Sequence, residues 1–398
     1  MKILQLSYRL PFPPKDGGAI GIHNITKAFF QLGHEVTLLS FNTKKHFVQP
    51  NKIDDSFRKL CQLHLIYKNT NLHPIAAFWS LLQNKSYHIS RFESKQFEQK
   101  LIELLQQNEF NLIQLEGIFM GVYVDIIRKY SQAKISLRAH NVEYKIWQQL
   151  AANAVFPKNS YLKILAAQLE KFETATWKKV DVVAAINADE LQLINASTQK
   201  NNAVLFPAGI FLNDFVEEQK SAEQNSLFHL GSMEWMPNVE GVDWFLKNVL
   251  PQVFIENNQI KFYLAGRKMP RKYFDEKQNG LYVIGEVDDA KQFMSDKQIM
   301  IVPLLSGGGV RIKIIEAMAM GKAIIATSQA AEGLNYTNGQ NIVIANSAQE
   351  MQQAIIKLLN DVEKIKSLGM NAQQHIQQNF DQLKLTQDFI KTIENFKQ

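Results

Sequence analysis

Short apolar runs alternate along the chain with longer segments in which apolar residues recur every three or four positions. The first such segment, residues 18–33, places Ile22, Ile25 and Phe29 on one helix face and ends at Gly33. Strands that alternate with helices pair in parallel, so a doubly wound sheet with helices on both faces is predicted. The strands of this first series are expected at residues 2–8, 34–41, 62–67, 111–117, 134–140, 181–187 and 203–209.

A second series of the same kind follows the polar, acidic stretch at residues 207–226. Its strands are expected at residues 226–232, 260–267, 281–287, 298–305, 322–327 and 341–346. The prediction is therefore two Rossmann-like α/β domains in tandem, residues 1–208 and 209–379, whose carboxyl strand edges face across a cleft. A terminal helix at about residues 380–398 carries Phe389, Ile393 and Phe396 on one face. It is expected either to cross back to the first domain or to pack on the second alone.

Composition bounds the class of protein. The chain has 398 residues, 46% of them hydrophobic and 21% charged, which is typical of a soluble protein of two domains. Its single cysteine, Cys61, excludes an internal disulfide and a cysteine-based metal site, and it is expected to be a packing residue in a cytoplasmic protein. The net charge of +6 suits anionic substrates or an anionic membrane surface and is too small to indicate nucleic acid. No apolar run has the length of a membrane span.

Three successive glycines join a buried strand to a helix within residues 299–321. The amides of Gly307, Gly308 and Gly309 precede the helix and have no intrahelical carbonyl partners. Arg311 and Lys313 fall in the expected first turn, where cations oppose the helix dipole unless an anion is bound. The pattern predicts a site for an anion such as a diphosphate.

Lys313 and Glu316 are three residues apart and share a helix face. A carboxylate at Glu316 can accept hydrogen bonds from ribose hydroxyls while the loop amides hold phosphates. The alternative is an ordinary Lys/Glu pair on a helix surface.

The first domain also carries polar residues at its expected carboxyl edge. His140, Asn141 and Glu143 follow one strand, and Glu116 ends another. A histidine there can hydrogen-bond a sugar hydroxyl, or it can be a loop residue satisfied by the next helix. Asp16, Gly17 and Gly18 join the first strand to the first helix and suit a close approach of backbone to ligand, although their spacing is not that of a dinucleotide fingerprint.

Two strand ends of the second series point to the same edge as the glycine triplet. Gly231 and Ser232 follow one strand, and Gly266 and Arg267 follow another; ordinary strand-end turns are the alternative. The sequence has no nucleophile elbow, no P-loop and no metal-ligand spacing among its histidines. Neither a metal nor a cofactor is expected.

The run GGGVRIKIIEAMAMGKAIIATSQAAEGL (307–334), together with HNVE and GSMEWMPNVEGVDWF, closely resembles the retaining glycosyltransferases of family 4, which have the GT-B fold. The resemblance extends over essentially the whole chain and is most specific at residues 316–327. It implies metal-independent transfer of a sugar from a nucleoside diphosphate sugar with retention at the anomeric carbon. It also implies an acceptor side in the first domain and a terminal helix that crosses back to it.

Carried onto this sequence, the resemblance assigns Glu316 to the second glutamate of the E-x7-E pattern, expected on the ribose hydroxyls. The first glutamate falls on Gly308, so the amides of Gly307 to Val310 are expected in its place. The usual arginine and lysine after the first strand of the donor domain are missing, and Arg311 and Lys313 are expected to supply that charge. His140 resembles the active-site histidine near the donor sugar, and Gly17 and Gly18 resemble the glycine loop near the diphosphate.

The expected function is glycosyl transfer to a glycan or glycolipid acceptor, with polysaccharide synthesis at the inner face of a membrane as its setting. A peripheral contact with anionic membrane is expected as a further partner, and nucleic acid is not. A nucleotide-sugar epimerase and a non-catalytic nucleotide-sugar or glycan-binding protein are the alternatives; an NAD-dependent reductase ranks last. The base, whether UDP or GDP, the sugar and the oligomeric state stay open.

Overall fold

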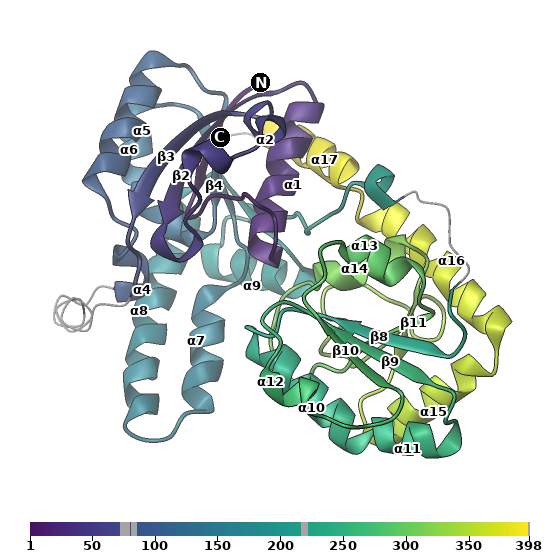
Figure 1. Ribbon diagram of the computed structural model, residues 1–398. Helices are drawn as coiled ribbons and strands as arrows, with labels where there is room; N and C mark the ends of the chain where they lie inside the picture. The colour runs from purple at the N-terminus through teal and green to yellow at the C-terminus, as the bar shows by residue number, and fades with distance from the viewer. Residues whose placement is uncertain (72–79, 81–85, 216–221, 397–398) are drawn as a thin grey trace. The chain divides into compact units, whose positions relative to one another are not determined.

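The computed structural model describes residues 1–71, 80, 86–215 and 222–396 (Figure 1). The chain forms two compact units. The first comprises Met1–Pro207 and Gln382–Gln398, and the second Ala208–Asp381. Residues 216–221, in the middle of the predicted linker, lie outside the described residues.

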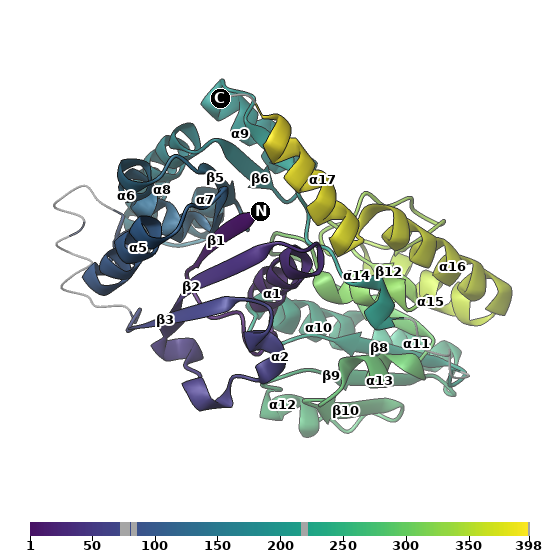
Figure 2. The same cartoon turned by 90° about the horizontal axis from the view of Figure 1, so that it is seen from above.

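The first unit contains a seven-stranded sheet in the order β3-β2-β1-β4-β5-β6-β7, in which every pair is parallel. Figure 2 shows β3, β2 and β1 side by side. All seven strands predicted from the first series of apolar runs are present. They are β1 (Lys2–Ser7), β2 (Glu35–Thr43), β3 (Gln62–Lys68), β4 (Leu112–Glu116), β5 (Lys134–Arg138), β6 (Val182–Ala185) and β7 (Ala203–Leu205).

Helix α1 shows how the sequence encodes the connecting helices. The carboxylate of Asp16 accepts from the N–H of Ala19 and caps the amino end, and the face with Ile22, Ile25 and Phe29 is fully buried. Gly33 follows in a left-handed conformation, with φ of 80°, which ends the helix. The α-helices of this unit are α1 (Gly17–Gln31), α2 (Asp55–Arg58), α4 (Tyr87–Ser90), α5 (Lys95–Gln107), α6 (Val124–Tyr130), α7 (Glu143–Ala152), α8 (Lys158–Lys179), α9 (Ala188–Thr198) and α17 (Gln382–Asn395).

The terminal helix α17 packs on the first unit. Phe389 and Ile393 are buried there, and the Phe389 ring stacks on Phe206 with ring centroids 4.2 Å apart. The Nζ of Lys134, on β5, donates to the carbonyls of Ile393 and Phe396, both at 2.7 Å, which satisfies acceptors at the helix's carboxyl end. The alternative of a terminal helix on the second domain alone is therefore wrong.

The second unit contains a six-stranded parallel sheet in the order β10-β9-β8-β11-β12-β13. All six predicted strands are present as β8 (Ser226–Leu230), β9 (Lys261–Ala265), β10 (Leu281–Gly285), β11 (Ile299–Val302), β12 (Ala323–Ala326) and β13 (Val343–Ile344). The α-helices are α10 (Met236–Asn248), α11 (Leu250–Glu256), α12 (Arg271–Phe274), α13 (Ala290–Ser295), α14 (Ile312–Ala319), α15 (Ala348–Leu359) and α16 (Val362–Asn379).

Each sheet has one point at which its strand order reverses. In the first unit it lies between β1 and β4, and in the second between β8 and β11. Ligands of open parallel sheets bind beyond the carboxyl ends of the strands at such a point. The loops that leave β8 and β11 carry Gly231 and the glycine triplet, so glycine backbone lies at the second switch point. Among the described residues, no helix is both long and apolar enough to cross a membrane.

Candidate functional site

The glycine triplet of the second unit folds around the side chain of Arg311. Its guanidinium donates to the carbonyls of Gly308 and Gly309 through Nη1, and to the carbonyl of Gly307 at 2.9 Å through Nη2. Gly307 and Gly309 have φ of 90° and 88°, conformations that glycine adopts without strain. One side chain therefore holds three successive peptide units in one orientation.

This orientation decides where the loop amides point. A trans peptide is planar, so the N–H that follows each carbonyl points the opposite way. With the carbonyls of residues 307–309 turned to Arg311, the N–H groups of Gly308, Gly309 and Val310 face away from it. Within the described ranges, none of these three N–H groups donates to a protein acceptor. Three successive unpaired N–H groups, with a cation behind them, form a nest of the kind that binds anions.

Arg311 also makes a cation–π contact with an aromatic ring. Its guanidinium carbon lies 4.6 Å from the ring centroid of Trp235. Burial lowers the pKa of Arg311 to about 10, an effect that the nearby Glu332 opposes, so the side chain keeps its charge at neutral pH. Arg311 is the N-cap residue of α14, and the placement of its charge in the helix's first turn was wrong. Three hydrogen bonds from Nη1 and Nη2 go to the loop carbonyls, and a direct contact of the guanidinium with a ligand stays a prediction.

Neighbouring loops fix the triplet in place. A Cβ on Gly307 would lie 2.6 Å from the Trp235 ring, so the indole packs directly on the backbone. The carbonyl of Gly307 accepts a second hydrogen bond from Nε2 of Gln329, at 2.7 Å, and Ser306 donates to Glu240 at 2.6 Å. Neither Trp235 nor Gln329 was predicted as a site residue. The tryptophan was visible in the quoted loop after β8, whereas no signal marked Gln329.

Lys313 and Glu316 form an ion pair on α14. The Nζ of Lys313 lies 2.5 Å from Oε2 of Glu316, and Glu316 is largely buried. The plain alternative of a Lys/Glu pair is thus present, although it is half-buried rather than on an open surface. A role for Glu316 on ribose hydroxyls stays a prediction.

The ends of β8 and β9 meet through glycine backbone. The N–H of Gly231 donates to Ala265, and a Cβ on Gly266 would lie 1.8 Å from the carbonyl oxygen of Gly231. Arg267 pairs with Glu234 at 2.9 Å, and the carbonyl of Ser232 accepts from the Asn238 amide. The strand-end residues predicted to bind the sugar donor therefore lie together at the second switch point, but Arg267 forms an ion pair with Glu234 of the same unit.

In the first unit, His140 and Glu116 form a pair at the carboxyl ends of β5 and β4. Nε2 of His140 lies 2.9 Å from Oε2 of Glu116, and the Tyr8 ring packs edge-on against the imidazole. A hydrogen bond from Nε2–H to the carboxylate selects the tautomer in which Nδ1 is an acceptor. His140 is thereby oriented, with Nδ1 left for a hydroxyl donor.

Glu116 lies at the carboxyl edge of the first sheet, as expected, and a role toward an acceptor stays a prediction. The residue has no exposed surface, and its other oxygen accepts from Gln5 at 2.9 Å. Arg138, itself buried, lies 3.8 Å from the same carboxylate, and proximity to Glu116 partly offsets the lowering of its pKa by burial. Glu116 is a buried counter-charge that orients His140.

The remaining candidates of the first unit are divided between α1 and α7. Asp16 binds Arg9 through two hydrogen bonds of 3.0 and 2.9 Å. Burial raises the pKa of Asp16, but the Arg9 charge and the hydrogen bonds from Ala19 and Arg9 together lower it. Gly17 and Gly18 begin α1; a Cβ on Gly18 would lie 3.1 Å from the Tyr8 hydroxyl, which places the helix start close to the ring that contacts His140. Glu143 begins α7 and pairs with His88 at 3.6 Å, while Asn141 is half-buried in the preceding loop. Asp16 and Glu143 are thus engaged by protein partners.

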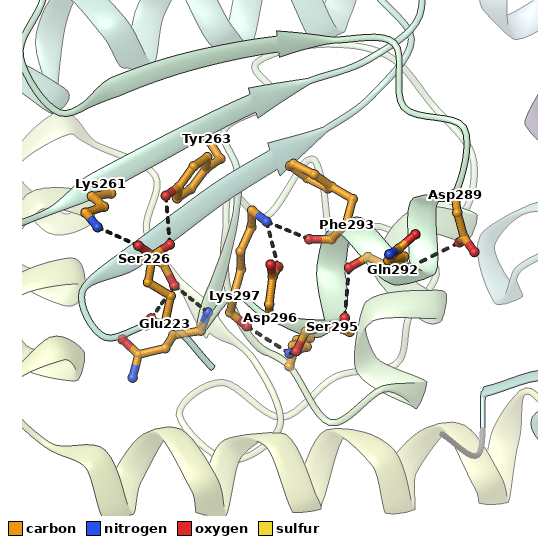
Figure 3. Close-up of polar contacts among 12 residues, drawn as sticks. Glu223, Ser226, Lys261, Tyr263, Asp289, Gln292, Phe293, Ser295, Asp296 and Lys297 are labelled. Carbon is orange, nitrogen blue, oxygen red and sulfur yellow. Dashed lines mark hydrogen bonds and ion pairs between the residues drawn. The ribbon is translucent and has the colours of Figure 1, made fainter. Parts of the chain in front are cut away.

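A separate polar cluster lies at the amino ends of the second sheet's strands, away from the glycine loops (Figure 3). Glu223 accepts from Lys261 at 2.5 Å and from the Tyr263 hydroxyl at 2.7 Å. Lys297, nearly buried, donates to the Phe293 carbonyl and lies 4.8 Å from the Tyr263 ring. These contacts fasten the segment that enters β8 to the strands beside it and are structural. In the described part of the chain, no group of three or more His, Cys, Asp or Glu residues is placed to hold a metal ion.

Part of the second unit is similar to a known protein family. Residues 224–361, which include the glycine triplet, match the family model described as "Glycosyl transferases group 1". An uncharacterized 44.6 kDa protein in the cps region of Klebsiella pneumoniae is 23% identical over 98% of this chain and 99% of its own length. An uncharacterized glycosyltransferase of Methanocaldococcus jannaschii is 32% identical over 29% of this chain and 31% of its own.

Solved structures share the fold over nearly the whole chain. HepE of Anabaena in complex with UDP aligns with a TM-score of 0.65 at 14% identity, covering 99% of this chain and 100% of HepE. Sucrose-phosphate synthase of Thermosynechococcus elongatus aligns with a TM-score of 0.70 at 16% identity, covering 99% and 98%. At these identities the likeness establishes the fold alone.

The two parallel sheets and these neighbours define a protein of GT-B fold, which confirms the predicted fold class. Over residues 224–361 the chain is similar to the group 1 glycosyltransferases, as the resemblance of its glycine run implied. Its assignment to family 4 within that group stays a prediction.

Proposed function

We propose that this protein is a glycosyltransferase that moves a sugar, with retention at the anomeric carbon, from a nucleoside diphosphate sugar to a hydroxyl acceptor in the synthesis of a cell-surface polysaccharide. The observation that carries the proposal is the nest of three N–H groups at Gly308, Gly309 and Val310, backed by Arg311, at the switch point of the second sheet. A diphosphate is an anion of suitable size and charge for such a nest.

The proposed chemistry follows from the charge that develops on the leaving group. As the glycosidic bond breaks, negative charge grows on the nucleoside diphosphate, and oriented N–H groups stabilise it without reorganising. The fixed charge of Arg311 behind the loop adds to this field, as does Lys313 at the start of α14. Glu316 accepts from the ribose hydroxyls, and Nδ1 of His140 accepts from a hydroxyl of a sugar. No metal is required in this scheme.

The proposed donor and setting draw support from the relatives. The HepE structure is a complex with UDP, which favours a uridine nucleotide over a guanosine one here. The Klebsiella relative is described as lying in a cps region, which favours a polysaccharide acceptor and a role at the cytoplasmic face of the membrane.

The test is a binding titration followed by a transfer assay. UDP is expected to bind and to raise the melting temperature more than GDP or ADP does. Incubation of UDP-sugars with lipid-linked or soluble glycans should then release UDP and give a product with the anomeric configuration of the donor, with and without a metal chelator. An inverted product contradicts retention, and loss of turnover on chelation contradicts metal independence.

A second candidate is a non-catalytic nucleotide-sugar-binding protein, favoured by glycine at position 308 where the family pattern has glutamate. It predicts binding of the donor with no release of UDP for any acceptor. An epimerase would instead interconvert the donor sugar in the absence of an acceptor.

A further inference from the structure

Helices α7 and α8 form a hairpin with an apolar tip. Figure 1 shows the two helices side by side, projecting from the sheet of the first unit, with the connecting loop at the far end. The outer half of the hairpin has a small core of its own, Ala151, Leu162 and Leu165, separate from the main core of the unit. The hairpin is therefore built to hold its tip out from the body of the unit.

The tip exposes large apolar side chains where a soluble surface is normally polar. Val155 and Phe156, in the connecting loop, are each 80% exposed. Leu150, Tyr161 and Ile164, on the flanking helix turns, are also exposed. Single exposed apolar residues are common, but a cluster of five within fifteen residues marks an interaction surface.

The charge around the tip has one sign. From Tyr144 to Leu169 the chain contains no aspartate or glutamate, whereas Lys145, Lys158 and Lys163 are all exposed there. The nearest acids along the chain, Glu143 and Glu170, lie at the base of the hairpin and contact other protein groups. An apolar tip with a cationic rim and no acids complements a surface that is apolar inside and anionic outside.

We infer that the α7–α8 tip is a membrane-docking surface, which inserts Val155 and Phe156 among the lipids of an anionic bilayer while Lys158 and Lys163 contact its headgroups. Two apolar residues and a few lysines support reversible association rather than permanent anchoring. The surface uses none of the residues of the glycine nest, so docking and donor binding are separable properties of the chain.

The experiment is flotation of the full-length protein with vesicles. Wild type is expected to float with vesicles of phosphatidylcholine and phosphatidylglycerol, to float poorly with phosphatidylcholine alone, and to be released by salt. A Val155→Ser/Phe156→Ser variant should partition at least about tenfold more weakly, because the apolar area that inserts is lost. Lys158→Gln/Lys163→Gln should reduce binding to the anionic vesicles only.

Matched controls come from the second unit. Ile255, 76% exposed on α11, gives Ile255→Ser as a control for loss of an exposed apolar side chain, and the exposed Lys247 gives Lys247→Gln for loss of charge. Both should float like wild type, and all variants should bind UDP as wild type does if the proposed function holds. Unchanged flotation of Val155→Ser/Phe156→Ser overturns the inference. The inference is also overturned if wild type is a dimer and Val155→Ser/Phe156→Ser is a monomer, because the tip would then be covered by a second copy of the chain.

Discussion

Replacing Arg311 by methionine tests whether this arginine acts by shaping the loop. Methionine keeps much of the apolar stem but removes the donors that hold the carbonyls of Gly307, Gly308 and Gly309. Hydrogen bonds from a charged donor contribute about 1.5–3 kcal/mol each, or about 5–9 kcal/mol for the three together. Water replaces most of this, because the loop is partly exposed. If about a quarter to a third of this hydrogen-bond free energy is lost because the loop becomes less ordered, the binding free energy of UDP weakens by about 2 kcal/mol, which lowers the affinity roughly thirtyfold.

The assay is calorimetric titration of UDP into wild type, Arg311→Met and Arg311→Lys, with Arg271→Met as a control for removal of an exposed arginine in the same unit. If Arg311 orients the loop, lysine should recover little, because one ammonium cannot bind three carbonyls as the planar guanidinium does. The amides of Gly308, Gly309 and Val310, which are unpaired in the free protein, should be protected from hydrogen exchange by UDP in wild type and much less in both Arg311 variants. Full recovery by lysine, with unchanged exchange, would show that Arg311 instead contributes charge directly to the ligand.

Three further predictions concern packing and protonation. Gly307→Ala should destabilise the second unit by about 1–3 kcal/mol, because the new Cβ meets Trp235 and the φ angle of Gly307 is positive. Gly308→Ala should leave the melting temperature unchanged, because its Cβ meets no atom within 4 Å. Equal effects of the two substitutions in thermal denaturation would contradict the loop geometry. Burial raises the pKa of Glu173 to about 8, although hydrogen bonds from the N–H groups of Tyr144 and Glu143 oppose this. Between pH about 5 and about 8 the folded protein therefore retains a proton that the unfolded chain loses, so the free energy of unfolding of wild type should fall relative to that of Glu173→Gln as the pH rises. A difference in unfolding free energy that does not change with pH in denaturant titrations would refute this prediction. Lys134→Met should lower the free energy of unfolding by about 1–2 kcal/mol, because the hydrogen bonds to carbonyls at the end of α17 are lost. An unchanged denaturation midpoint would show that those contacts contribute nothing to stability.

The strands and the nest-bearing loop were predictable because their signals are local. Apolar runs alternate with helical periodicity throughout both halves, and a glycine triplet between strand and helix can adopt the positive φ angles of a turn. The direction of the Arg311 side chain was not predictable. Its sequence position gives the charge, while the contacts with the loop carbonyls depend on a turn that forms only when Trp235 and Gln329 pack against Gly307.

The burial of Glu116 had a signal that could have been used. Three neighbouring strands each carry a pair of polar residues two positions apart, and alternate residues of a strand point to the same face. The pairs are Gln5 and Ser7 on β1, Gln114 and Glu116 on β4, and Ser136 and Arg138 on β5. Aligned in the sheet, these residues form a buried polar row that ends at His140. The register between strands, which sequence alone does not provide, is what brings these separate polar residues side by side.

The central claim is that the N–H groups of Gly308, Gly309 and Val310 bind the diphosphate of the donor. A crystal structure of the protein with UDP tests it most directly. The account predicts phosphate oxygens about 2.9 Å from at least two of these nitrogens, with Arg311 still bound to the loop carbonyls on the other side. A diphosphate bound elsewhere, or one contacted by the Arg311 guanidinium while the three N–H groups stay unpaired, would contradict it.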